Sequence, residues 1–222
     1  MQRYFCLFLA GLVGCALLAA PASAAETKAM FDGKSLEGWD FFLQDSNAKM
    51  EDVWSVRDGM IICKGKPMGF LATKEKFKDF KLVVEWRWAP GTKQDSRPNS
   101  GVLLRITGDK KMLPKCVEAQ LMSGSAGDIW AFEGFKVKGD TERFRENPTR
   151  QMCGLSKIEG AEKELGDWNK YEITLVGDKL TLVVNGKKVN EAAGAEVLAG
   201  SIGLQSEGGE IHFRRVELTP ID

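Results

Sequence analysis

The chain has 222 residues, and its 31 basic and 31 acidic side chains give a formal net charge of zero. This balance provides no electrostatic reason to expect nucleic acid or an anionic membrane surface as a partner. The length suits one sizeable hydrophobic core, and no repeat, low-complexity tract or linker divides the chain. We therefore expect a single domain over residues 25–222, preceded by a leader.

Residues 1–24 have the features of a secretory signal peptide. Residues 4–20 are almost wholly apolar, and Ala22-Ser23-Ala24 is a small-residue cleavage site. We therefore expect export to the periplasm or the medium. Leu12-Val13-Gly14-Cys15 resembles a lipobox, so lipid attachment at Cys15 is the alternative, but the apolar run continues past Cys15 and favours cleavage after Ala24. The run is short for a membrane span, which needs about 20 residues.

From about Phe31 onward the sequence is typical of β-strands. In residues 82–88 every second side chain is large and apolar, which is the period of a half-buried strand. Similar patterns predict strands at residues 54–56, 60–64, 70–73, 81–88, 101–107, 116–122, 171–176, 179–184, 201–207 and 211–218. Gly177-Asp178 and Asn185-Gly186 predict hairpins. Many short strands with regular turns favour an all-β sandwich or jelly roll.

Two stretches lack a clear strand pattern. Residues 123–167 are rich in glycine and charge, and we expect an irregular segment that serves as a lid or binding loop. Residues 192–198 have room for a short helical turn and nothing more.

Polar side chains alternate with apolar ones in two of the predicted strands. Glu118 and Gln120 share one face of their strand, and Val117, Ala119 and Leu121 share the other. Gln205 and Glu207 likewise point away from the face that holds Ile202 and Leu204. Carboxylates and amides on one sheet face suit a ligand with many hydroxyl groups, so this face is the predicted site.

Several chemistries are excluded by what the chain lacks. His212 is the only histidine, which removes multi-histidine metal sites and two-histidine acid–base schemes. Nucleotide-binding glycine loops are absent, and so is the E-x-D-x-x-E strand of laminarinase-type glucanases. Beyond the leader stand Cys63, Cys116 and Cys153. We expect Cys63 in the core, and a Cys116–Cys153 disulfide stays open as an alternative to free thiols.

A series of short motifs in chain order resembles one known family, the domain once catalogued as DUF1080 and now described as 3-keto-disaccharide hydrolase, or 3-keto-glucoside lyase and hydratase. The motifs cover nearly all of residues 25–222: Phe31-Asp32-Gly33-Lys34-Ser35-Leu36-Glu37-Gly38-Trp39, Trp54-x-Val56-x-Asp58-Gly59, Asp79-Phe80-x-Leu82-x-x-Glu85-Trp86-Arg87, Asn99-Ser100-Gly101-Val102, Glu118-x-Gln120, Gly127-Asp128, Gly166-Asp167-Trp168-Asn169-x-Tyr171-Glu172, Val184-Asn185-Gly186 and Gly203-Leu204-Gln205-Ser206-Glu207-Gly208.

This resemblance implies a concanavalin A-like jelly-roll β-sandwich of two antiparallel sheets. It also implies a bacterial exported enzyme that acts on sugars already oxidised at C3, with its ligand on the concave sheet. The expected chemistry is removal of the C2 proton, β-elimination of the C1 substituent and hydration.

Catalytic roles are assigned to two residues. Glu118, on the strand that matches the family's E-x-Q motif, is the predicted base or a metal ligand. Its alternative is a structural ion pair with Arg105 or Arg87. Arg105 is predicted to bind the C3 oxygen or the developing enolate, and a sheet-face ion pair is the alternative there too.

The remaining candidates are predicted to bind substrate: Gln120, Asn99, Asp128, Trp130, Gln205, Glu207 and His212. Trp130 is either a sugar-stacking aromatic or a core anchor, and His212 either faces the cleft or is structural. No spacing establishes a cofactor, but Glu118, Asp128 and Glu207 have the oxygen ligands that a divalent metal prefers. The partner is then a 3-keto sugar or another glycoside.

Two other functions remain open from the sequence. A lectin-like carbohydrate-binding domain shares the fold and a polar face, but it relies on aromatic platforms more than on carboxylates. A conventional glycosidase needs a pair of acids that no single strand provides. A polar face rich in Glu, Gln and Arg favours the 3-keto enzyme.

Overall fold

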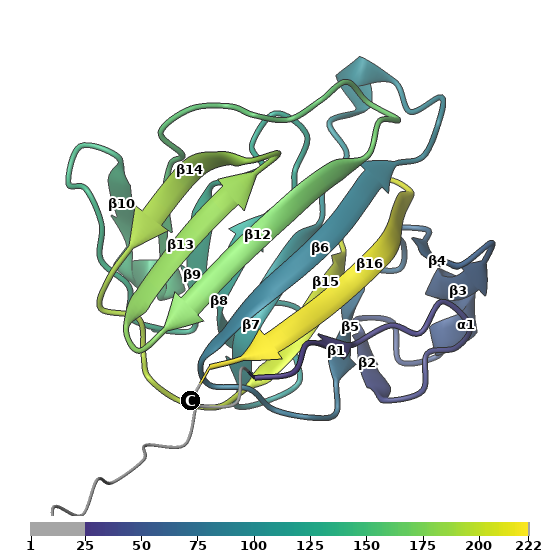
Figure 1. Cartoon of the computed structure of the whole chain (residues 1–222), viewed down its shortest axis with the longest axis horizontal. Helices are drawn as coiled ribbons and strands as arrows, with labels where there is room; N and C mark the ends of the chain where they lie inside the picture. Colours follow the sequence, from purple (N-terminus) through teal and green to yellow (C-terminus); the bar gives the residue numbers. More distant parts are fainter. Residues whose placement is uncertain (1–24, 222) are drawn as a thin grey trace, which may run out of the picture.

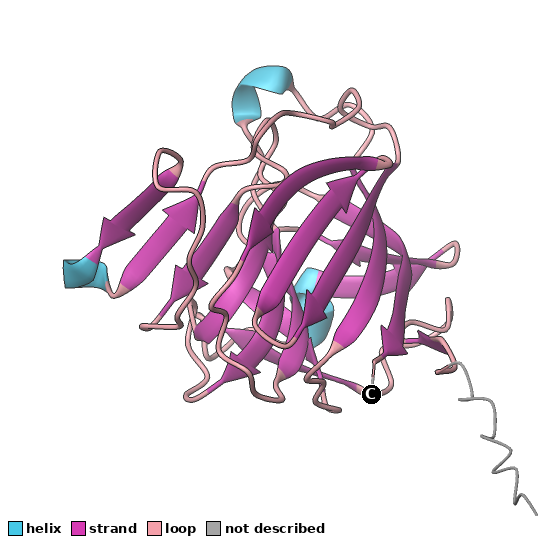
Figure 2. Ribbon diagram, turned by 60° about the vertical axis from the view of Figure 1, so that its left-hand side comes forward, coloured by secondary structure: helices cyan, strands magenta, loops and turns pink. Residues whose placement is uncertain are grey.

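The computed structural model describes residues 25–221, and its regular secondary structure is almost entirely β-strand. The expected signal peptide and Cys15 lie outside these residues. Two antiparallel sheets face each other, as Figures 1 and 2 show. This arrangement confirms the predicted all-β sandwich.

The first sheet has the strand order β14-β13-β12-β6-β16-β4-β3, with β1 paired to β16. Its strands are β1 (Lys28–Ala29), β3 (Trp54–Arg57), β4 (Met60–Cys63), β6 (Phe80–Trp88), β12 (Asn169–Val176), β13 (Lys179–Val184), β14 (Lys187–Ala192) and β16 (Ile211–Pro220). Asn185 and Gly186 have φ angles of 51° and 81°. Positive φ at both positions is typical of a tight hairpin turn, and this one joins β13 to β14 as the sequence predicts.

The second sheet has the order β10-β11-β9-β8-β7-β15-β5-β2. Its strands are β2 (Trp39–Leu43), β5 (Gly69–Thr73), β7 (Gly101–Thr107), β8 (Lys115–Gln120), β9 (Ile129–Phe132), β10 (Phe144–Asn147), β11 (Met152–Leu155) and β15 (Ser201–Ser206). The described residues add only the short helices α1 (Met50–Val53), η1 (Gln94–Ser96) and η2 (Pro148–Arg150). None of the described helices is long and apolar enough to cross a membrane.

Period-two alternation sends one set of side chains from each sheet into a shared core. Leu82, Val84 and Trp86 of β6 are fully buried and belong to the same cluster as Val117 and Leu204 of the second sheet. Full burial of such side chains contributes about 1.5–3 kcal/mol each to stability. The opposite face of the second sheet carries a separate apolar cluster, made of Phe70, Ala72, Leu103, Cys116 and Phe132.

The expectation of an irregular segment over residues 123–167 is wrong in part, because this segment contains β9, β10 and β11. Three of the four residues of β10 are exposed, so no apolar alternation marks it. It forms the edge of the second sheet, where polar and charged side chains are common. Residues 192–198 form no helix.

All three described cysteines are free thiols. Cys63 is fully buried in the core, as expected. Cys116 belongs to the outer apolar cluster, whereas Cys153 packs against the core between the sheets. These two side chains point to opposite faces of the second sheet, so the alternative of a disulfide between them is wrong.

Candidate active site

The candidate site lies on the outer face of the second sheet, the face turned away from the first sheet. Gly101 of β7 pairs with Gln120 of β8, and Leu103 pairs with Glu118. On the other side of β7, Leu204 of β15 pairs with Val102, which sets Gln205 beside Gly101. The register therefore brings Glu118, Gln120 and Gln205 together, although they are up to 87 residues apart along the chain.

Glu118 is 2% exposed and occupies the centre of this group. Its carboxylate lies over Gly101, because a Cβ at position 101 would be 1.8 Å from Oε1. Oε1 has no hydrogen-bond partner, and within residues 25–221 no salt bridge involves Glu118. The structure therefore does not support the structural ion pair with Arg105 or Arg87.

The surroundings of Glu118 favour its protonated form. Burial raises the pKa of Glu118 well above its usual value, and the nearby carboxylate of Glu207 raises it further. Burial also raises the pKa of Glu207, which is half-buried. The raised pKa values make these two carboxylates stronger bases than an ordinary glutamate.

Two amide side chains complete the cluster, which we call the Glu118 site (Asn99, Glu118, Gln205 and Glu207). Gln205 is fully buried, and neither its amide nitrogen nor its oxygen has a partner. Asn99 lies two residues before Gly101, and the backbone nitrogen of Asn99 donates a hydrogen bond to the Gly208 carbonyl at 2.7 Å. The buried Oδ1 of Asn99 has no hydrogen-bond partner either. Buried polar groups are nearly always hydrogen-bonded in folded proteins, so unpartnered ones on a single face indicate a place for a polar ligand.

Three further predicted residues lie at the margins of the site. Gln120 is 7% exposed, and its Oε1 accepts hydrogen bonds from the backbone nitrogens of Leu121 and Met122, both at 2.8 Å. Asp128 accepts from the backbone nitrogen of Lys157 at 2.8 Å and so holds a loop. Trp130 of β9 pairs directly with Glu118 and is half-exposed on the same face.

Arg105 does not reach the Glu118 site. Its φ is 53°, and the pairing of β7 with β8 shifts register between Leu104 and Thr107. This irregularity turns the fully buried guanidinium toward the loops that close one end of the sandwich. There it donates to the carbonyls of Lys78, Glu196 and Gly177 at 2.6–2.9 Å and to Asp79 at 3.1 Å. The structure therefore favours the ion-pair alternative for Arg105, with Asp79 as its partner, over the predicted contact with a C3 oxygen.

His212 is also far from the site, because it belongs to the first sheet. Its neighbours Ile211 and Phe213 enter the core, so His212 points to the outer face of that sheet. Its Nδ1 accepts from Arg87 Nε at 3.3 Å, and its Nε2 lies 2.8 Å from Glu210 Oε1. This position favours the structural alternative for His212 over contact with a ligand at the Glu118 site.

The three oxygen ligands considered for a divalent metal are not gathered by the structure. Among residues 25–221 no group of three or more His, Cys, Asp or Glu side chains is close enough to hold a metal ion. Asp128 holds the Lys157 loop, which leaves Glu118 and Glu207 as the carboxylate pair.

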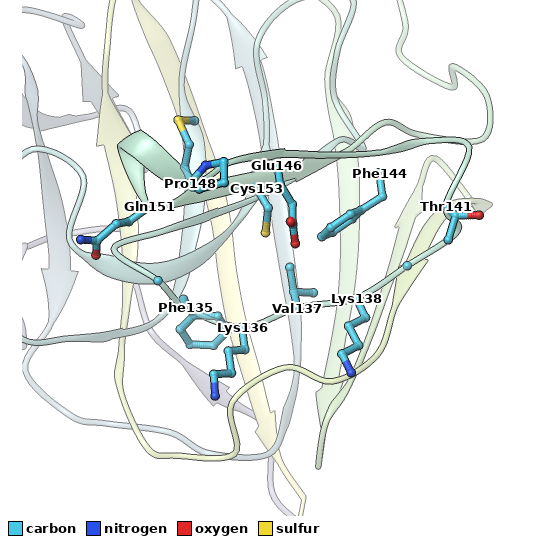
Figure 3. Close-up of a pocket in the computed structure, with 13 residues that line it drawn as sticks. Phe135, Lys136, Val137, Lys138, Thr141, Phe144, Glu146, Pro148, Gln151 and Cys153 are labelled. Carbon is cyan, nitrogen blue, oxygen red and sulfur yellow. The ribbon is translucent and has the colours of Figure 1, made fainter.

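A cavity of about 550 Å³ lies elsewhere, between residues 134–141 and the β10–η2–β11 hairpin. Figure 3 shows Phe144, Glu146 and Cys153 of the hairpin facing Phe135 and Val137. Phe135 and Val137 belong to the core between the sheets, so this cavity opens on the opposite side of the second sheet from Glu118. We do not assign it to the Glu118 site.

Two glycines shape the site and were not identified as site residues from the sequence. Gly101 leaves room for the Glu118 carboxylate, and Gly154 of β11 leaves room for the Trp130 ring, which a Cβ at position 154 would approach to 2.7 Å. Neither role shows in a single strand, because it depends on which strands are paired. The only sequence signal was the position of Gly101 within Asn99-Ser100-Gly101-Val102.

Two solved structures have similar folds. A putative glycosyl hydrolase from Parabacteroides distasonis aligns with a TM-score of 0.62 at 17% identity, over 88% of this chain and 94% of that one. A β-glucanase from Bacillus licheniformis aligns with a TM-score of 0.56 at 11% identity, over 90% of this chain and 100% of that one. At these identities the similarity shows the jelly-roll fold alone.

The sequence comparisons are more specific. A 3-keto-disaccharide hydrolase from Bacteroides thetaiotaomicron is 23% identical over 247 aligned positions, which cover 91% of this chain and 81% of that protein. The family model of the 3-keto-α-glucoside-1,2-lyase-like domain matches residues 26–219, which is almost all of the described chain. The chain therefore belongs to the 3-keto-α-glucoside-1,2-lyase-like domain family.

Proposed function

We propose that this protein is an enzyme that cleaves glucosides or disaccharides already oxidised at C3. Its reaction is removal of the C2 proton, β-elimination of the C1 substituent and hydration of the product. One observation carries the proposal: Glu118 is a buried carboxylate without a cationic partner, and it shares a sheet face with the unpartnered amide of Gln205 in a chain of this family.

The ketone at C3 makes the C2 proton acidic. In the proposed reaction the ionised Glu118 takes this proton, and the C–H electron pair forms an enolate with its charge on the C3 oxygen. As the carbonyl re-forms, a C1–C2 double bond is made and the bond from C1 to the leaving oxygen breaks. The leaving oxygen takes its proton from a water molecule. Water then adds, with hydroxide at C1 and a proton at C2.

The raised pKa of Glu118 serves this chemistry directly. A carboxylate with an ordinary pKa is a weak base, whereas one whose pKa lies nearer the working pH takes a proton from carbon more readily. Positioned general-base catalysis contributes about 10²–10⁴-fold in rate. Because Glu118 has to be ionised to act, activity rises with pH through its pKa.

The amides provide binding and charge stabilisation. With Arg105 in its structural position, the Gln205 amide N–H is the buried donor that remains for the C3 oxygen, and a donor aimed at a developing oxyanion is worth about 10²–10³-fold. The free Oδ1 of Asn99 accepts a hydrogen bond from a sugar hydroxyl.

Export is a further part of the proposal. The apolar leader and its Ala22-Ser23-Ala24 site support cleavage after Ala24. N-terminal sequencing of the protein recovered from periplasm or medium tests this: a mature chain that starts at Ala25 supports it, and lipid found on Cys15 contradicts it.

The test of the enzymatic proposal compares matched glucosides that differ only in oxidation at C3. The purified protein is incubated with each, and the released C1 substituent is measured. Release from the 3-keto glucoside alone supports the proposal. Saturable binding without release from either substrate points instead to a lectin-like binding domain, and release from the native glucoside indicates a conventional glycosidase.

A further inference from the structure

A row of residues crosses the second sheet from Glu118 toward its edge. In the register of the sheet, Glu118 of β8 pairs with Trp130 of β9, Trp130 pairs with Gly154 of β11, and Gly154 pairs with Arg145 of β10. Residues that are paired across antiparallel strands share one face. The outer face that holds Glu118 therefore continues, strand by strand, to Arg145.

The Trp130 ring covers the backbone of Gly154 in this row. A Cβ at position 154 would lie 2.7 Å from Cζ3 and 2.8 Å from Cε3 of the Trp130 ring, so a larger residue at this position would displace the ring. The indole is half-exposed and packs against the apolar cluster on the outer face of the second sheet, not against the core between the sheets. This arrangement makes an aromatic platform on the sheet and does not fit the alternative of a core anchor.

A cavity of about 330 Å³ opens beside this platform, and we call it the Trp130 subsite. It is lined by Trp130, Met152, Cys153, Glu146 and the exposed side chains of Arg145, Asn147 and Arg150. Arg145 donates to Ser156 Oγ at 2.6 Å, and no hydrogen bond or salt bridge to another described residue holds the Arg150 guanidinium. Hydrogen-bond donors therefore stand next to an apolar aromatic surface.

This combination suits a pyranose ring. One side of a pyranose presents C–H groups, which pack against an aromatic face, and its rim presents hydroxyls, which accept hydrogen bonds from guanidinium groups. Gly154, over which the ring lies, is two interstrand spacings from the Glu118 strand, or about 10 Å. The subsite is thus beside the reacting sugar and apart from it.

We propose that the Trp130 subsite binds the sugar that leaves from C1, and that the enzyme is therefore selective for 3-keto disaccharides over 3-keto glucosides with a small C1 group. This inference rests on the proposed function. Trp130 is then a specificity residue that stacks on the departing sugar, while Glu118 acts on the sugar that carries the ketone.

The experiment uses two substrates, a 3-keto disaccharide and the corresponding methyl 3-keto glucoside, with the parent protein, Trp130→Ala and Arg150→Ala. Trp168→Ala is the matched control, because Trp168 lies between Arg87 and Arg214 on the first sheet, far from Glu118. Both kcat/KM and calorimetric binding are measured for each pair.

Trp130→Ala is expected to lower kcat/KM for the disaccharide by roughly 3- to 10-fold, the loss of one aromatic contact, and to leave the methyl glucoside within twofold. Arg150→Ala is expected to show the same pattern, a lower kcat/KM for the disaccharide with little change for the methyl glucoside. Trp168→Ala is expected to leave kcat/KM for both substrates unchanged. Equal losses on the two substrates, or no loss on either, overturn the subsite.

Failure of the proposed function has a different result, namely no release from either 3-keto substrate by the parent protein. In that case the calorimetric binding measurements alone test whether the Trp130 subsite binds the second sugar. Weaker binding of the disaccharide alone by Trp130→Ala supports it, and unchanged disaccharide binding overturns it.

Discussion

Replacing Glu118 with glutamine is expected to make the protein more stable while it removes activity. Glu118 is 2% exposed, its Oε1 has no hydrogen-bond partner, and Glu207 is the nearby charge that raises its pKa. In its ionised form the side chain thus sits in an environment that disfavours the charge. Glutamine has nearly the same shape and no charge, so Glu118→Gln removes this destabilisation.

The size of the effect follows from the burial. An uncompensated buried polar group costs about 1–3 kcal/mol, and more when it is charged. Each unit by which the folded pKa exceeds the unfolded one is worth about 1.4 kcal/mol. For a chain of this length, 1 kcal/mol changes the melting temperature by about 2–4 °C. We expect Glu118→Gln to gain about 1–3 kcal/mol at pH 8.

The pH dependence has a definite sign. Because the folded pKa is raised, the native protein holds a proton on Glu118 that the unfolded chain has lost above the ordinary value of 4.5. The parent protein therefore loses stability as the pH rises from about 4.5 to the folded pKa, and stays destabilised above it. The gain from Glu118→Gln is accordingly small near pH 4.5 and grows with pH.

The assay is thermal and urea unfolding of the parent, Glu118→Gln, Glu207→Gln and Glu142→Gln between pH 4.5 and 9. Half-buried Glu207 is expected to give a smaller gain of the same sign, and exposed Glu142 less than about 0.5 kcal/mol. A Glu118→Gln protein that is less stable than the parent at pH 8, or whose gain shrinks with rising pH, would refute the reasoning.

Three further outcomes are expected. Gly101→Ala places a Cβ 1.8 Å from the present position of Glu118 Oε1, so it should displace the carboxylate. We expect kcat to fall by about 10²-fold while the circular dichroism spectrum stays unchanged. A parental kcat would show that the position of the carboxylate is unimportant. Arg105→Met removes the donor for the Lys78 and Gly177 carbonyls and for the Asp79 carboxylate, so the free energy of unfolding in urea should fall by about 3–5 kcal/mol. Molecules that stay folded should keep the parental kcat. A stable but inactive variant would instead give Arg105 a catalytic role. Alkylation of the native protein should modify half-exposed Cys153 first, because Cys63 and Cys116 are buried and burial raises the pKa of Cys63 to about 11. Mass spectrometry that finds Cys116 modified first would contradict this prediction.

Alternation within single strands identified most of the candidate site, because a strand's period of two is fixed by its backbone. Glu118, Gln120 and Gln205 share a face as predicted, and their meeting follows from the strand register. Alternation says which residues of one strand share a face, but it does not say to which sheet the strand belongs. His212 was misplaced for this reason, since its strand lies in the first sheet.

Other features depend on geometry that no short sequence pattern reports. The positive φ of Arg105 breaks the alternation of β7 and turns the side chain away from the site, although the residue order there is that of a regular strand. Strand β10 escaped detection because it is an exposed edge strand with little apolar patterning. The space that Gly101 and Gly154 leave for their neighbours becomes visible only when the paired strands are known.

The most direct test of the account is the release of the C1 substituent from a 3-keto glucoside that carries deuterium at C2, by the parent protein and by Glu118→Gln. The account predicts slower release from the deuterated substrate by the parent, and a loss of about 10²-fold or more in Glu118→Gln. Release by Glu118→Gln at the parental rate would contradict the assignment of Glu118 as the base that removes the C2 proton.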